Sequence, residues 1–248
     1  MVILTALFTC ASIHAQLGGR GGMMGAPRGP RFGGSMSKLF EDNNSFSADI
    51  EVTTTDENKK SAIIPGKMAK LDSMSRMEMD LSTMKGDAVP AEAIPQLKTM
   101  GLDKMIILSR PDKKLNYMVY PGLSAHVEMP IEDSDETKTA SDYTIEQTEV
   151  GKETIGSHPC VKNKTVISEK NAPDKKYEYL VWNAPDLKKF PLKIQREDGG
   201  ALVVMAFNNV KFDKPDAAQF EAPKNSTKHD SMMSIMQEVM MKKMSEGK

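Results

Sequence analysis

Apolar side chains occupy every second position over residues 46–52, and polar side chains lie between them. A strand with one face in a core and the other face in solvent shows this period of two. The pattern begins after about residue 40 and predicts a half-buried β-strand.

Nine further segments have strand-like sequences, and Gly, Pro or Asp residues separate them. These segments are 76–81, 105–108, 115–120, 125–129, 143–150, 161–167, 177–182, 192–195 and 201–207. Segments 105–108 and 115–120 flank a Pro-Asp-Lys-Lys turn, which predicts a hairpin. Many strands at this spacing with few helices favour a single sheet that closes or nearly closes.

Two segments predict helices instead. Residues 90–100 fit a short helix, and residues 227–244 fit a longer amphipathic one. In the longer segment apolar residues recur at steps of three and four, namely Met232, Met233, Ile235, Met236, Val239, Met240 and Met244. Thr227 and Asp230 resemble a capping box at its start.

The first forty residues predict export. Residues 1–15 contain an apolar run followed by small residues, which predicts a signal peptide cleaved after Ala15. Residues 16–39 hold eight of the 17 glycines and predict a flexible linker rich in Gly and Arg. A lipoprotein acylation site at Cys10 and a cytoplasmic start are the alternatives. The apolar run is far shorter than the ~20 residues that span a bilayer, so no transmembrane segment is predicted in the mature chain.

Composition and charge narrow the function classes. The 248 residues are 39% hydrophobic and 27% charged, which suffices for a moderate core. Lys and Arg number 33 against 34 Asp and Glu, so the net charge is −1 and gives no general attraction to nucleic acid. We therefore predict one large β domain over residues 40–223, a methionine-rich helical segment over 224–248, and no nucleic-acid partner.

Candidate catalytic chemistry is sparse. The sequence contains no G-x-S-x-G, H-E-x-x-H or Walker A motif. His158 and Cys160 form the one local pair that a thiolate nucleophile or half a metal site could use. A buried structural cysteine after a turn explains the pair better. We predict no catalytic residue, no metal-site residue and no cofactor, and no intramolecular disulfide, because cleavage leaves Cys160 as the only cysteine.

Methionine is in excess, with 20 in the chain and six between Met232 and Met244. Thioethers are soft ligands for Cu(I), and both Met233 with Met236 and Met241 with Met244 have a spacing that suits one helical face. Unbranched methionine side chains also form adaptable surfaces for apolar ligands, and core packing is the third explanation. We predict a lid whose ligand-binding residues Met233, Met236 and Met240 face the concave side of the sheet.

Several short stretches of the sequence resemble a known family. They lie at 76–79, 105–114, 117–122, 151–160, 182–187, 190–193 and 220–223. Over residues 46–223 they resemble the exported bacterial family called domain of unknown function 4412, which is similar in turn to the LolA and LppX periplasmic carriers. The resemblance implies a mainly β fold, in which a strongly curved antiparallel sheet forms an unclosed half-barrel. Short helices and a C-terminal amphipathic helix are expected to cover its concave face, which holds acyl chains in the carriers.

These expectations combine into one functional prediction. The chain is expected to be a non-catalytic protein of the bacterial cell envelope, periplasmic or secreted, that binds a lipid or lipoprotein acyl chain in the concave face. A methionine-rich copper-handling protein and a structural component that binds an envelope protein partner are the alternatives. An enzyme that uses His158 and Cys160 is a further alternative.

Overall fold

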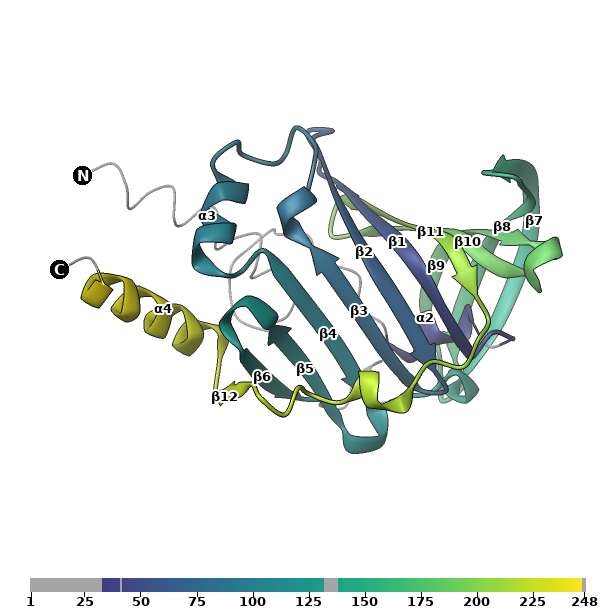
Figure 1. The fold of residues 1–248 in the computed structure, drawn as a ribbon. Coiled ribbons are helices and arrows are strands. Elements are labelled where there is room, and N and C mark those ends of the chain that lie inside the picture. Colours follow the sequence, from purple (N-terminus) through teal and green to yellow (C-terminus); the bar gives the residue numbers. More distant parts are fainter. Residues whose placement is uncertain (1–32, 41, 132–137, 247–248) are drawn as a thin grey trace.

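The computed structural model describes residues 33–40, 42–131 and 138–246. These residues form one sheet of twelve strands in the order β12-β6-β5-β4-β3-β2-β1-β11-β10-β9-β8-β7 (Figure 1). The strands are β1 Ser45–Thr55, β2 Ser61–Leu71, β3 Met74–Asp80, β4 Lys104–Arg110, β5 Leu115–Tyr120, β6 Ala125–Pro130, β7 Tyr143–Ile155, β8 His158–Glu169, β9 Ala172–Ala184, β10 Phe190–Asp198, β11 Ala201–Lys211 and β12 Thr227–His229.

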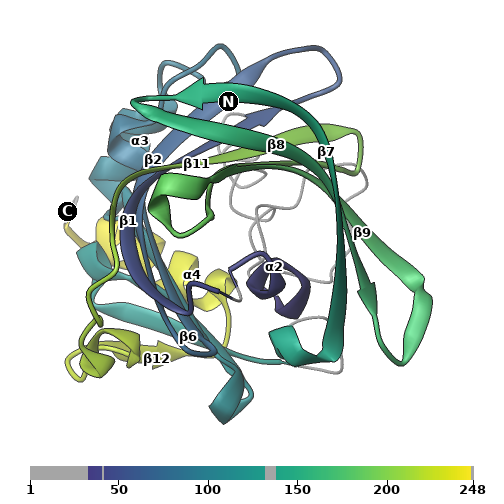
Figure 2. The ribbon, with the colours of Figure 1, turned by 90° about the vertical axis from the view of Figure 1, so that its right-hand side faces the viewer.

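The sheet curves strongly but does not close (Figure 2). Neighbouring strands are antiparallel except β12 and β6, which are parallel. Within the described residues the end strands β12 and β7 do not pair with each other. The predicted mainly β fold with an unclosed curved sheet is therefore confirmed. Each of the ten predicted strand segments overlaps a different strand, and β4 and β5 form the predicted hairpin.

Strand β2 has no counterpart among the predicted segments, because Pro65 and Gly66 interrupt its pattern. Proline cannot donate a hydrogen bond to the ladder and is confined to free edges. Strand β2 pairs with β1 over its full length, but its pairing with β3 begins only at Gly66. A Cβ atom at Gly66 would lie 2.1 Å from the carbonyl oxygen of Glu78. The close approach of β3 therefore requires glycine at this position.

The inner, concave face of the sheet carries the main core. On β1, Phe46, Ala48, Ile50 and Val52 are buried, as their alternation predicts. The same hydrophobic cluster extends over the concave face of the other strands and includes residues from three α-helices or their flanks. A single layer of sheet with short covering segments thus encloses the core.

The α-helices among the described residues are α2 (Gly34–Lys38), α3 (Ala93–Met100) and α4 (Met232–Glu246). Helix α2 lies inside the curve of the sheet (Figure 2), whereas α3 and α4 lie toward the other end of the half-barrel (Figure 1). Helix α3 confirms the short helix expected within residues 90–100.

The N-terminal boundary of the domain differs from the prediction. Helix α2 falls within the expected flexible linker, yet Gly34, Ser35 and Met36 are buried. A Cβ atom at Gly34 would lie 2.5 Å from the carbonyl oxygen of Lys138, so this glycine permits close packing. Residues 33–39 are therefore part of the folded domain, whereas the predicted signal peptide and the rest of the linker lie outside the described residues.

The C-terminal helix also begins later than predicted. Thr227 lies in β12, where its backbone N–H donates to the carbonyl oxygen of Ser124 at 2.7 Å. Ser231 caps α4 instead, because the N–H of Ser234 donates to its Oγ at 3.2 Å and the N–H of Ser231 donates to Ser234 Oγ at 3.3 Å. The predicted capping box at Thr227 and Asp230 is wrong, since the edge of β6 binds residues 227–229 as a strand.

Between β11 and β12 the chain crosses the outer face of the sheet (Figure 1). Phe220 of the short helix η7 (Ala217–Phe220) is buried against Ala69 and Leu71. The buried Arg110 donates to the carbonyl oxygen of Phe220 at 3.3 Å and forms an ion pair with Glu221. These contacts fix this crossing segment to the outer face.

Candidate functional site

The concave face has two parts of different composition. The part built by β2 to β5 and the segment after β3 buries six methionines, which we call the methionine half: Met68, Met77, Met79, Met84, Met105 and Met118. Met68, Met77 and Met118 lie in one cross-strand row with Ile107. Met79 and Met105 pair in the next row. Because thioether side chains are unbranched and polarisable, this surface can adapt to apolar groups of different shape.

The second part, which we call the aromatic half, consists of Phe40, Phe46, Phe190 and Phe207. Phe40 stacks on Phe46 at a centroid distance of 5.2 Å and meets Phe190 and Phe207 edge-on at 5.6 and 5.5 Å. Phe46 meets Phe190 at 4.8 Å. Such edge-to-face contacts are favourable and have a defined geometry. The N-terminal segment thus completes this half by supplying Phe40.

Helix α4 covers the core with a different set of residues from the one predicted. Ile235 is 1% exposed, and Met232, Met236 and Val239 pack partly buried against the same core. Met233 and Met240 are 67% and 45% exposed, so the prediction that they face inward is wrong, whereas Met236 does pack against the core. Successive residues turn by about 100° around a helix, which places the apolar residues on an arc wider than the docked face. A role of these three methionines in ligand binding stays a prediction.

The surroundings of His158 and Cys160 favour a structural role for this pair. Cys160 is a free cysteine that is 2% exposed, and burial raises the pKa of its thiol. His158 opens β8, and its Nδ1 lies 2.7 Å from Oδ2 of Asp186. Because a nucleophilic cysteine needs a stabilised thiolate, this environment opposes that role. Within the described part of the chain, no group of three His, Cys, Asp or Glu side chains could hold a metal ion.

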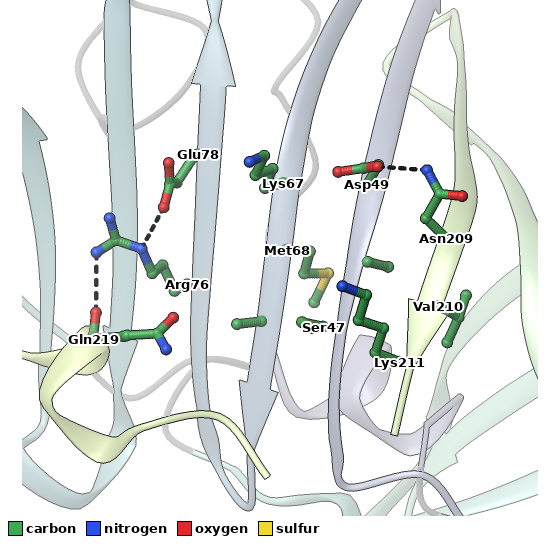
Figure 3. Close-up of a pocket in the computed structure, with 12 residues that line it drawn as sticks. Ser47, Asp49, Lys67, Met68, Arg76, Glu78, Asn209, Val210, Lys211 and Gln219 are labelled. Carbon is green, nitrogen blue, oxygen red and sulfur yellow. Dashed lines mark hydrogen bonds and ion pairs between the residues drawn. The ribbon is translucent and has the colours of Figure 1, made fainter. Parts of the chain in front are cut away.

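A groove of about 580 Å³ lies on the outer face, beside the crossing segment (Figure 3). Arg76 donates to Glu78 at 2.7 Å and to the carbonyl oxygen of Gln219 at 2.9 Å. On the other side of the groove, Asn209 donates to Asp49 at 2.7 Å. Polar and apolar side chains both line the groove, which could accept a small solute, and the bond from Arg76 to Gln219 also anchors the crossing segment.

The described residues contain no helix that is long and apolar enough to cross a membrane.

Neither protein-family models nor curated proteins give a match to this sequence. Three similar solved structures are an uncharacterized conserved protein from Thermus thermophilus, a LolA superfamily protein from Nitrosomonas europaea and the lipoprotein LppX from Mycobacterium tuberculosis. Their TM-scores are 0.43, 0.39 and 0.37, and their identities are 12%, 12% and 10%. The matches cover 79%, 75% and 71% of this chain and 96%, 96% and 93% of those chains.

Membership of the family called domain of unknown function 4412 stays a prediction, because no family model matches. The function is therefore inferred below from the residues of this chain.

Sequence reasoning missed where most of the buried methionines lie. It concentrated on the C-terminal segment, where Met233, Met240, Met241 and Met244 are exposed. Met77 and Met79 lie in the predicted strand segment 76–81, where they alternate with charged residues and are both buried. The remaining methionines join them only through the register of the four strands β2 to β5, which no local pattern contains.

Proposed function

We propose that this protein is a non-catalytic bacterial envelope protein that binds an apolar ligand, a lipid or lipoprotein acyl chain, against the methionine half of its concave face. The observation that carries the proposal is the composition of that surface: six buried methionines contributed by β2 to β5 and the segment after β3. Methionine side chains change rotamer readily, so such a surface can reshape around an alkyl chain.

The cover over this half is suited to displacement. Helix α4 contacts the core through one fully buried residue, Ile235, and three partly buried ones. Strand β12, which connects α4 to the sheet, pairs with β6 over three residues only. Elements with few buried contacts open at the lowest free-energy cost. A ligand would enter when α4 moves away, and α4 would then close over its alkyl chain through Ile235, Met232 and Met236.

Export is part of this proposal. The apolar segment before Ala15 and the small residues around it support cleavage after Ala15 and release into the periplasm or the medium. Mass spectrometry of the exported protein should find Gln16 at its N-terminus. An intact Met1 in a cytosolic fraction would contradict export without affecting the proposed binding site.

Native mass spectrometry of the protein purified from its own cell envelope tests the binding function. We expect an adduct with the mass of a lipid or acylated peptide, which disappears after organic extraction and returns on addition of the extracted lipid. A copper adduct in place of a lipid would favour metal handling by the exposed thioethers of α4. If the protein binds neither, a structural role with a protein partner becomes the better explanation.

A Met77→Lys variant localises the ligand, because it places a charge in the methionine row. The control is Glu78→Lys, which changes the next residue of β3, on the opposite face. We expect the first variant to lose the adduct and the second to keep it. Circular dichroism and thermal melting establish that both variants are folded. Retention of the adduct by folded Met77→Lys would overturn the proposed location.

A further inference from the structure

A row of polar side chains crosses the concave face directly below the methionine rows. Lys70 pairs with Ser75, Ser75 with Ser109, and Ser109 with Asn116 across strands β2 to β5. Phe46 and Met129 end the row on either side. Lys70, Ser75 and Ser109 are 4, 5 and 6% exposed. Buried polar groups on an otherwise apolar surface are costly, so this row calls for an explanation.

The face on which the row lies follows from strand alternation. Lys70 is two residues from the buried Met68, and its cross-strand partner Phe46 belongs to the main core. The residues on either side of Lys70, Ala69 and Leu71, pack instead against Phe220 on the outer face. Lys70 therefore belongs to the concave face, whereas most lysines of this chain are at least partly exposed.

The ammonium group of Lys70 makes fewer hydrogen bonds than it can donate. It donates one hydrogen bond, to the backbone oxygen of Asp72, although an ammonium group has three donors. No carboxylate among the described residues forms an ion pair with it. The hydroxyl groups of Ser75 and Ser109 likewise have no hydrogen-bond partner within that part of the chain. Donors thus remain available on three buried side chains of adjacent strands.

Electrostatics supports the same conclusion. Burial lowers the pKa of Lys70 from 10.5 to about 8, and the nearby charge of Asp72 opposes this effect only in part. The folded protein therefore holds an ammonium group that is poorly compensated. An anion placed against this group would stabilise its charged form, which burial disfavours.

We propose that the ligand is a single-chain amphiphile with a carboxylate head, which binds Lys70, Ser75 and Ser109, while its alkyl chain lies along the methionine rows. This inference rests on the proposed function and names the ligand class for the same face. Residues two apart on a strand are separated by roughly 7 Å, so the first methionine row begins about one such step from the head and the second lies about 14 Å away. The polar row fixes the head, and the methionines accommodate the chain.

The decisive experiment compares oleate with methyl oleate, which has the same chain without the charge. Binding to the full-length mature protein is measured at pH 7 by displacement of a fluorescent apolar probe. We expect oleate to bind at least about tenfold more tightly than its ester, because charge-assisted hydrogen bonds to a buried ammonium are strong. Equal affinities for acid and ester would overturn the inference.

Variants assign the effect to Lys70. Lys70→Met removes the charge and retains most of the side-chain volume, so we expect it to abolish the preference for oleate while methyl oleate binds as before. Lys67→Met is the matched control, since Lys67 lies on the same strand but is exposed on the outer face. It should retain the full preference. A preference that survives in folded Lys70→Met would also overturn the inference.

The outcomes separate this inference from the proposed function. If neither oleate nor its ester binds the wild-type protein, the proposed apolar site itself is contradicted. If both bind equally, the site stands and only the carboxylate head is wrong. Should Lys70→Met fail to fold, Ser75→Ala and Ser109→Ala each test the row, and each should reduce the preference for oleate about threefold. An unchanged preference in both serine variants would count against it.

Discussion

The two halves of the concave face are packed with different kinds of side chain, aromatic rings in one and methionines in the other. In the aromatic half, Phe40 touches three other rings at centroid distances of 5.2–5.6 Å, and each contact has a defined interplanar angle. In the methionine half, flexible thioether side chains belong to the same buried cluster as Leu97 of α3 and Ile235 of α4. Aromatic contacts favour one arrangement, whereas methionine contacts tolerate many. The difference supports the proposal that the ligand binds against the methionine half, while the aromatic half stabilises the fold.

The segments that pack over the concave face also differ in how deeply they are buried. The segment leading from α2 to β1 places Phe40 within the aromatic cluster, where it is fully buried. Helix α4 has a single fully buried residue and carries Met233, Met241 and Met244 in solvent. Local stability follows the number of buried contacts, so α4 should open far more often than the segment around Phe40.

The largest expected effect concerns Phe40. A Phe40→Leu substitution removes three ring–ring contacts and leaves a cavity, so we expect a loss of about 3–4 kcal/mol in the free energy of unfolding. Met77→Leu introduces leucine at a buried position of the methionine half and should lower the free energy of unfolding by less than about 1.5 kcal/mol. Urea denaturation measures both. Equal losses would remove the mechanical distinction between the two halves.

Lys70 lies at the border between the halves, and its effect should depend on pH. Its pKa is about 8 in the folded protein and 10.5 in its ordinary state, so between these values the unfolded chain binds more protons. Raising the pH through this window therefore favours the folded state. At 1.36 kcal/mol for each pKa unit, this shift corresponds to a gain of about 3 kcal/mol.

The measurement compares wild type with Lys70→Met, in which this titration is absent. At pH 7 the variant should be more stable than wild type by about 3 kcal/mol, and at pH 10.5 the two should be nearly equal. Groups common to both proteins cancel in the difference. A difference in stability that does not change between these two pH values would show that burial does not penalise the charged form of Lys70.

A smaller effect is expected at Ile235, the fully buried residue through which α4 packs against the core. Ile235→Ala should destabilise the protein by roughly 2 kcal/mol and, because the helix detaches, increase the fluorescence of a dye that binds apolar surfaces. Met233→Ala changes an exposed residue on the same helix and is the control. Equal dye binding by the two variants would mean that α4 does not cover this half.

Local patterns predicted the strands of both halves, because alternation is a property of neighbouring residues. They could not predict β2, since Pro65 and Gly66 are there for pairing and close-approach reasons that involve β3. They also assigned the Gly-rich segment around α2 to a linker, because glycine permits both flexibility and close packing.

The polar row was equally inaccessible from the sequence. Lys70, Ser75 and Ser109 are ordinary surface residue types, and only the strand register places them side by side on a buried face. The methionine half depends on the same register. The sequence therefore predicted that the concave face is apolar, and only the structure shows that it contains methionine rows, an aromatic cluster and a polar row.

The smallest expected effects concern the methionines first predicted as lid contacts. Met233 and Met240 are exposed, so replacing either with Gln should change the free energy of unfolding by less than about 0.5 kcal/mol and leave oleate affinity within twofold. Met236 packs against the core, and Met236→Gln should weaken oleate binding severalfold, because a polar amide would face the alkyl chain. Isothermal titration of the three variants distinguishes the two faces of α4. If Met233→Gln or Met240→Gln weakened binding as much as Met236→Gln, the helix would have to turn its exposed face inward when the ligand binds, and the docked face seen here would belong to the empty state alone.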